Sequence, residues 1–167
     1  MRTALALSLV VAGVVLRVIP HPWNFAPIGA IALFGGARFD RRWMAIVLPL
    51  ITMLIGDAFI GFHSAMPVIY ATYGLIAVIG MFLRDRRRIA AIGGASLLSS
   101  TIFYVTTNFD VWARGTTYAK TAAGLVTCYL AAIPFFERTV ASDLLFSAIF
   151  FGVFAAVERT SPAFARA

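Results

Sequence analysis

The feature that most constrains this chain is a series of long apolar stretches with only short interruptions between them. A membrane-crossing helix needs about 20 mainly apolar residues, and in lipid the backbone must satisfy its own hydrogen bonds. The composition agrees, because 61% of the residues are apolar and only 13% are charged, whereas soluble domains have about 45–50% and about 25%. The 167 residues leave room for about six such helices. We therefore expect one all-α integral membrane domain over residues 1–167, without a soluble catalytic domain.

Clusters of proline, glycine and arginine divide the chain into seven candidate segments. These occupy residues 4–19, 25–38, 43–61, 66–83, 89–107, 119–135 and 140–157. The stretch 119–135 is the weakest, because Lys120 and Pro134 flank a modest apolar centre. We prefer six spans with 108–138 as one outer segment, and keep open a seventh half-helix or interfacial segment.

The net charge of +7, from 14 Lys and Arg against 7 acidic residues, would indicate nucleic acid binding in a soluble protein. In a membrane protein, an excess of positive charge instead reflects the topology, because Lys and Arg in short loops favour the cytoplasmic side. It also reflects attraction to anionic lipid headgroups. With the N-terminus inside, most arginines fall on the inner side for either six or seven spans. We therefore expect a cytoplasmic N-terminus, the lipid bilayer as surroundings and no nucleic acid partner.

Asp57 is the most informative single residue. A helix that begins at Trp43 would carry its carboxylate about 21 Å into the membrane, and an ionisable residue at such depth is a functional candidate. The alternative is that Gly56 ends the helix and Asp57 caps the next turn in the headgroups. His63 lies six residues further on, in a loop that can bring it to Asp57, and an imidazole can bind a metal or change charge near neutral pH.

A second group of candidates lies between residues 89 and 118. Ser96, Ser100, Tyr104 and Thr107 form one polar stripe at helical spacing, which favours helix packing over pocket lining. Beyond the stripe, Asn108, Trp112 and Tyr118 place an amide, an indole and a phenol together with Asp110 in one expected loop. Such a mixture fits the wall of a ligand site, and headgroup anchoring is the alternative.

Ala4, Ser8 and Ala12 form a small-residue face on the first helix, which allows another helix to pack closely, within this chain or from a partner. The segment Gly115–Thr121 resembles a phosphate-binding loop only superficially, because Ala119 replaces the required glycine. The single cysteine, Cys128, excludes an intrachain disulfide and a cysteine-cluster metal site. We expect that the protein is not an enzyme and that it uses no cofactor.

The segment 17–37, RVIPHPWNFAPIGAIALFGGA, resembles the signature of a bacterial family of small membrane proteins assigned to transport. Later positions match the same pattern, and the likeness extends over nearly the whole chain. They are Asp57, Gly61-Phe62-His63, Met66-Pro67 with Tyr70, Asn108 with Trp112, Tyr118, Gly124-Leu125 and Pro134-Phe135-Phe136. That family is similar to the substrate-capture (S) components of energy-coupling-factor vitamin transporters, including solitary vitamin B12 carriers.

The resemblance implies six helices in the bacterial inner membrane and a substrate pocket that opens outward. It places Asp57, His63, Tyr70, Asn108 and Trp112 in the pocket, and Tyr118 remains a further candidate for substrate binding. It also implies that the first-helix face docks an energy-coupling membrane subunit with its ATPases. Two positions depart from the pattern: Ser8 replaces an alanine, and Cys128 is not in an outer loop. If the substrate were a corrinoid, His63 would therefore be the candidate cobalt ligand.

These observations lead us to expect a small inner-membrane protein that captures a vitamin-like solute, a cobalamin among the candidates. Two alternatives stay open. One is a membrane-embedded enzyme that uses Asp57 and His63 on a lipid-linked substrate. The other is a non-catalytic scaffold organised through the first helix.

Overall fold

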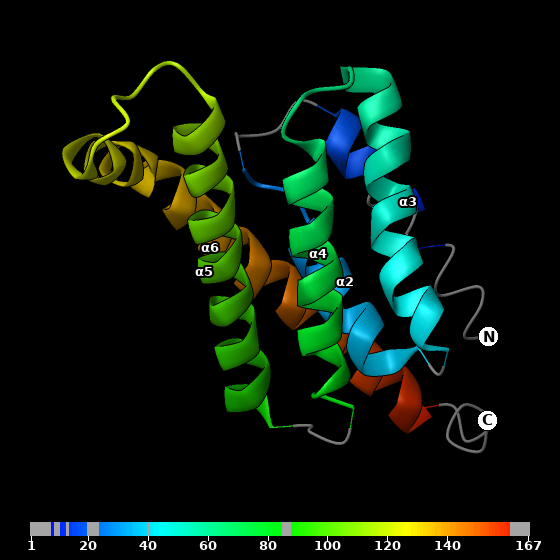
Figure 1. Cartoon of the computed structure of the whole chain (residues 1–167). Helices are drawn as coiled ribbons and strands as arrows, with labels where there is room; N and C mark the ends of the chain where they lie inside the picture. The colour runs from blue at the N-terminus through cyan, green and yellow to red at the C-terminus, as the bar shows by residue number, and fades with distance from the viewer. Residues whose placement is uncertain are drawn as a thin grey trace.

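The computed structural model describes residues 8, 11–12, 14–19, 24–39, 41–84 and 88–160, and this part of the chain is helical without strands. Five helices follow a short helical segment at residues 14–18 (Figure 1). They are α2 (Ile28–Arg38), α3 (Arg42–Ile60), α4 (Met66–Met81), α5 (Ile89–Arg114) and α6 (Ala122–Thr160). The expected all-α class is therefore confirmed.

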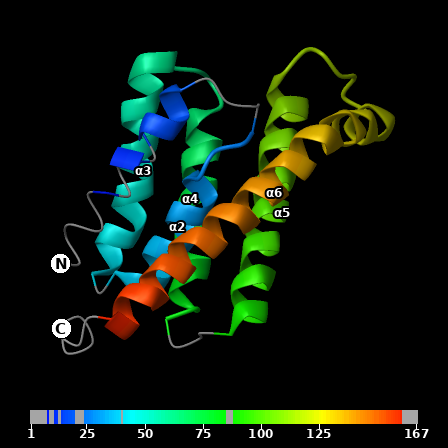
Figure 2. The same cartoon turned by 180° about the vertical axis from the view of Figure 1, so that it is seen from behind.

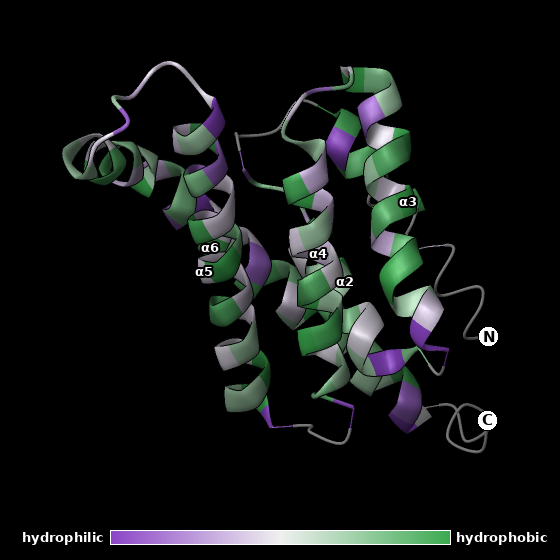
Figure 3. Ribbon diagram, in the orientation of Figure 1, coloured by the Kyte–Doolittle hydropathy of each residue, from purple (hydrophilic) through white to green (hydrophobic). Residues whose placement is uncertain are grey.

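Three of these helices, α3, α5 and α6, are long and apolar enough to cross a membrane. Large apolar side chains remain exposed on them, among them Leu54, Val105 and Leu130. Figure 3 shows hydrophobic residues along the outer faces of α3, α4 and α5, and hydrophilic residues mainly near their ends. A soluble monomer rarely exposes so much contiguous apolar surface, so these helices indicate a membrane protein.

Helix α2 is the centre of the bundle, although it is the shortest of the five helices. Every residue from Ile28 to Ala37 is buried, as a helix that is apolar on all sides requires. The Phe34 ring packs edge-on against Phe151 and Phe154 of α6, with ring centroids 5.2 and 5.6 Å apart. Helix α2 therefore forms the core of the bundle.

Close backbone contact joins α2 to α4. A Cβ added at Gly36 would lie 2.1 Å from the Ala77 carbonyl oxygen, and one added at Gly80 would lie 2.2 Å from that of Leu33. Only glycine leaves room for such an approach, and α4 therefore packs closely over one side of α2.

The end of the chain differs from the expectation. The stretches 119–135 and 140–157 are not two segments, because α6 runs without interruption from Ala122 to Thr160 and includes Pro134. Its 39 residues correspond to about 58 Å, and the helix crosses the others obliquely on the face of the bundle that Figure 2 shows. The expectation of 108–138 as one outer segment is therefore wrong, because the only break in that region is the loop 115–121.

The expected loop from Asn108 to Trp112 is also wrong. Helix α5 continues to Arg114, since no proline or glycine lies between Asn108 and Arg114. The Asn108 amide donates to the Tyr104 carbonyl oxygen within the same helix (2.8 Å), and Arg114 pairs with Asp110 one turn away. Only Tyr118 of the aromatic and polar candidates in this region lies in the loop.

The polar stripe on α5 packs against α6, as expected. The Ser100 hydroxyl donates to Asp143 (2.6 Å), and the Tyr104 hydroxyl donates to the Tyr129 carbonyl oxygen (2.6 Å). Thr107 instead donates to its own helix at Phe103 (2.7 Å). Hydroxyl groups thus hold α5 to α6 along most of the stripe.

Candidate solute-binding cavity

A cavity of about 180 Å³ lies inside the bundle. Its floor is formed by Ala26 and Ile28, where α2 begins. Helix α2 has 11 residues and is only about 16 Å long. It therefore extends along only part of the length of the helices around it. The space beyond its N-terminus stays unfilled, and the first helical segment, α3, α4, α5 and α6 surround it.

One wall of the cavity carries a buried ion pair. The Arg17 guanidinium lines the cavity and pairs with Asp57 on α3, whose side chain is 0% exposed. The Tyr70 hydroxyl donates to the second oxygen of the Asp57 carboxylate (2.6 Å). Both oxygens of Asp57 are thus occupied, and the carboxylate lies behind Arg17 and holds it in place.

Gly56 explains how Arg17 reaches this position. A Cβ added at Gly56 would lie 2.2 Å from Arg17 Cδ and 2.4 Å from its Nε. The arginine side chain therefore lies directly on the α3 backbone. This glycine does not end α3, which continues to Ile60 before Gly61 adopts a positive φ of 105°.

A second buried carboxylate stands on the opposite wall. Asp143 of α6 is 4% exposed and lines the cavity together with Thr139. It accepts the hydrogen bond from Ser100, and one of its oxygens lies against Gly29 in the first turn of α2, where an added Cβ would be only 2.3 Å away. The positive end of the α2 dipole favours a carboxylate there. Among the described residues, no cation forms an ion pair with Asp143.

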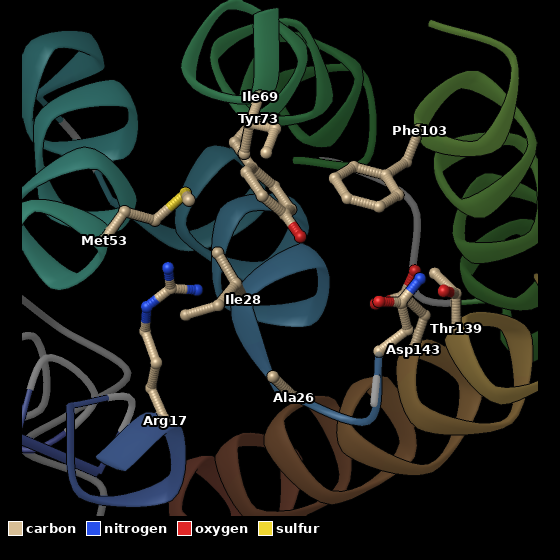
Figure 4. A pocket seen from close by; sticks show the side chains of 10 residues that line it. Arg17, Ala26, Ile28, Met53, Ile69, Tyr73, Phe103, Thr139 and Asp143 are labelled. Carbon is tan, nitrogen blue, oxygen red and sulfur yellow. The ribbon is translucent and has the colours of Figure 1, made fainter. Parts of the chain in front are cut away.

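Aromatic and apolar side chains form the remaining walls. Tyr73 and Phe103 lie with ring centroids 5.2 Å apart, and Met53 and Ile69 complete this part of the lining. Figure 4 shows the Tyr73 hydroxyl pointing into the cavity, between Arg17 on one side and Asp143 on the other. Half of the lining residues are polar or charged, and a concave site that combines such groups with aromatic and apolar walls can orient a ligand.

The candidates from the sequence fall into two groups. Asp57 and Tyr70 form a hydrogen bond behind Arg17 without lining the cavity themselves, and Asp57 lies within α3 rather than in a turn after Gly56. His63 is exposed in the loop between α3 and α4, whereas both oxygens of Asp57 are engaged by Arg17 and Tyr70. The structure therefore does not bring His63 and Asp57 together as a catalytic pair would require.

Asn108, Trp112 and Tyr118 do not line this cavity. They lie at the far end of α5 and in the following loop, where the Trp112 indole donates to the Ala119 carbonyl oxygen (2.9 Å) and stacks with the Lys120 ammonium. These contacts hold the loop to the helix end. Of the first-helix face, Ser8 is exposed and Ala12 is half-buried, while Ala4 lies outside the described residues.

None of the residues that line the cavity was among the binding-site candidates from the sequence, and two of them, Arg17 and Asp143, are charged. Asp143 is the single acidic residue within the apolar stretch 140–157, so the depth argument applied to Asp57 would also have identified it. Arg17 ends the first apolar stretch and gave no comparable signal, because arginines at segment ends are common. Within the described part of the chain, no three His, Cys, Asp or Glu side chains gather to hold a metal.

The comparisons with known proteins find a family and no named relative. DUF6580, described as a family of unknown function, matches residues 1–164. No curated protein and no solved structure matches the chain.

Proposed function

The chain belongs to the DUF6580 family, and we propose that it is a small membrane transport protein that captures a vitamin-like solute in the cavity at the start of α2. The observation that carries this proposal is a hollow lined by residues of every helical segment, with a charged group on each of two opposite walls. Burying ionisable groups in a membrane domain is costly, and they are typical of substrate pathways there.

The backbone around the cavity supports the same function. Residues 24–27 are not helical and lead into α2 beside the cavity. Irregular backbone at membrane depth is tolerated where it is buried in protein or lines a cavity, and helices that begin within the membrane form the substrate sites of many transporters. Here the irregular segment is tied to α6 by the Ser142 hydroxyl, which donates to the Ala26 carbonyl oxygen (2.9 Å).

The depth of the cavity favours entry from one end of the bundle. Asp57 lies in the last turn of α3 and Ile69 in the first turn of α4, next to the loop that joins these helices. The opposite end carries Arg41, Arg84 and Arg88. We place the arginine-rich end in the cytoplasm. The cavity then lies towards the outer side of a bacterial inner membrane, and the N-terminus lies on its cytoplasmic side.

The volume of about 180 Å³ favours a small solute. Sites for drug-sized ligands have roughly 300–1,000 Å³, so the favoured solutes are compact ring compounds rather than a corrinoid. The exposed His63 is accordingly no part of the proposed site. Release into the cell would use a coupling membrane subunit with ATPases, docked on the first helix.

Binding to the purified protein tests this function. Protein in lipid nanodiscs would be titrated with thiamine, biotin, riboflavin, cobalamin and smaller ring compounds related to them. We expect micromolar or tighter binding of a small member of this panel. Ala26→Trp should abolish it by filling the cavity, whereas Ala71→Trp, on an exposed face of α4, should not.

Two results would contradict the proposal. One is the absence of micromolar binding for every compound. The other is equal binding by the wild-type protein and Ala26→Trp. Melting curves of both variants establish that they are folded, and Ala26→Leu replaces the tryptophan variant if that variant unfolds.

A further inference from the structure

We propose that the solute is a small organic cation, whose positively charged nitrogen binds the Asp143 carboxylate. This inference rests on the proposed function and names the substrate class of the same cavity.

When Asp143 is ionised, the charges around the cavity do not balance without a ligand. The Arg17 guanidinium and the Asp57 carboxylate form an ion pair, and Tyr70 completes the hydrogen bonding of Asp57. This wall is therefore neutral as a unit. Asp143 adds one further carboxylate, and the described residues supply it with a hydroxyl group but with no cation. A buried charge without a counter-ion is unfavourable, and a cationic ligand would remove that cost.

Two contacts of Asp143 stabilise the ionised carboxylate that such a ligand requires, against the cost of burying its charge. The Ser100 hydroxyl donates to Oδ2, and the N-terminal turn of α2 lies against Oδ1 at Gly29. Both contacts stabilise negative charge. The carboxylate lies on the cavity wall and can accept a further hydrogen bond from a ligand ammonium.

The aromatic walls also suit a cation with a ring. Tyr73 and Phe103 pack together beside the cavity, and their π faces attract a positive charge nearby. Figure 4 shows Tyr73 between Arg17 and Asp143 and Phe103 on the side of Asp143, so a ring packed against these aromatic side chains would lie next to the Asp143 carboxylate. An anionic solute would instead be repelled by the Asp143 carboxylate, and the charge of Arg17 is already neutralised by Asp57.

Three compounds of nearly equal shape test the charge preference: 2-phenylethylammonium, the neutral 2-phenylethanol and the anionic phenylacetate. Their binding would be measured by calorimetry with the full-length protein in nanodiscs of zwitterionic lipid, with empty nanodiscs as the blank. We expect the ammonium compound to bind about tenfold or more tightly than either isostere, as a charge-assisted hydrogen bond provides.

Asp143→Asn should weaken binding of the ammonium compound about ten- to hundredfold and leave binding of 2-phenylethanol nearly unchanged. Asp110→Asn, which removes a carboxylate at the far end of α5, is the matched control and should leave all three affinities unchanged. If Asp143→Asn does not fold, the affinity ratio of the three compounds on the wild-type protein decides the question.

The outcomes separate this inference from the proposed function. If a vitamin-like compound binds and Ala26→Trp abolishes it, but the neutral or anionic isostere binds as well as the cation, the cation preference is wrong and the proposed function stands. Unchanged cation binding by folded Asp143→Asn would also overturn the inference. If no compound of either set binds, both proposals fall.

Discussion

Two arginine–aspartate pairs show how differently the same residues act at the scale of single side chains. Arg17 and Asp57 come from separate helical segments, and their side chains are 16% and 0% exposed. Arg114 and Asp110 lie one turn apart on α5 with 48% and 11% exposure. Removing one partner of a buried pair leaves an uncompensated charge. In an exposed pair, water solvates the remaining partner at little cost.

We therefore predict that Asp57→Asn lowers the free energy of unfolding by about 3–5 kcal/mol, while Asp110→Asn has little effect. Unfolding of the two variants in detergent would be followed by circular dichroism. The double variant Arg17→Met/Asp57→Leu should recover part of the loss, because it removes both charges. Equal effects of Asp57→Asn and Asp110→Asn would contradict this account of the ion pair.

The two neighbouring tyrosines of α4 offer a second test at this scale. The Tyr70 hydroxyl bonds Asp57, whereas the Tyr73 hydroxyl points into the cavity (Figure 4) and has no hydrogen-bond partner among the described residues. Tyr70→Phe should destabilise the protein by about 1.5–3 kcal/mol, the range for a hydrogen bond to a charged group. Tyr73→Phe should leave the melting temperature nearly unchanged and alter solute affinity instead. The reverse pattern would show that the roles of the two residues are exchanged.

At the scale of elements, the fold depends on how closely α4 approaches the buried helix α2. Gly36 and Gly80 face each other across this contact, and an added Cβ at Gly36 would lie 2.9 Å from the Gly80 Cα. Since neither backbone can move away without opening the core, the contact has no room for even one methyl group. Gly74, on the same helix α4, has nothing within 4 Å of its Cβ position.

Gly80→Ala should therefore cost about 1–3 kcal/mol through overpacking. Gly74→Ala should be neutral or stabilising by about 1 kcal/mol, because alanine is the better helix former. Melting temperatures of the two variants in the same detergent make the comparison. A Gly80→Ala protein as stable as Gly74→Ala would show that the two helices separate easily.

At the scale of the whole molecule, the connections divide between two ends. The loops that join α3 to α4 and α5 to α6 lie at one end, whereas α2 and α4 end and α3 and α5 begin at the other (Figure 1). The second end carries Arg38, Arg41, Arg84 and Arg88. Together with the apolar spans, this asymmetry predicts one orientation in a membrane.

Cysteine labelling tests that orientation. In a background that lacks the buried Cys128, His63→Cys and Tyr118→Cys should react with a membrane-impermeant maleimide added to spheroplasts. Arg41→Cys and Arg88→Cys should react only after the membrane is opened. The opposite pattern would place the cavity towards the cytoplasm and remove capture from outside as its function.

The sequence by itself determined the helical class, the long apolar helices and the position of Asp57 within one of them, because hydrophobicity and helix breakers act locally along the chain. It therefore predicted closely where α3, α4 and α5 begin. It did not reveal that α6 continues through Pro134, because backbone groups freed by a proline can be satisfied by the tertiary surroundings.

Only the tertiary structure decided which polar groups meet. Arg17 reaches Asp57 across 40 positions of the chain, and Ser100 reaches Asp143 across 43. Such contacts depend on how the helices rotate and cross, and here a short α2 and its close glycine contact with α4 set both. The cavity is the volume that this packing leaves empty, so no local pattern in the sequence encodes it.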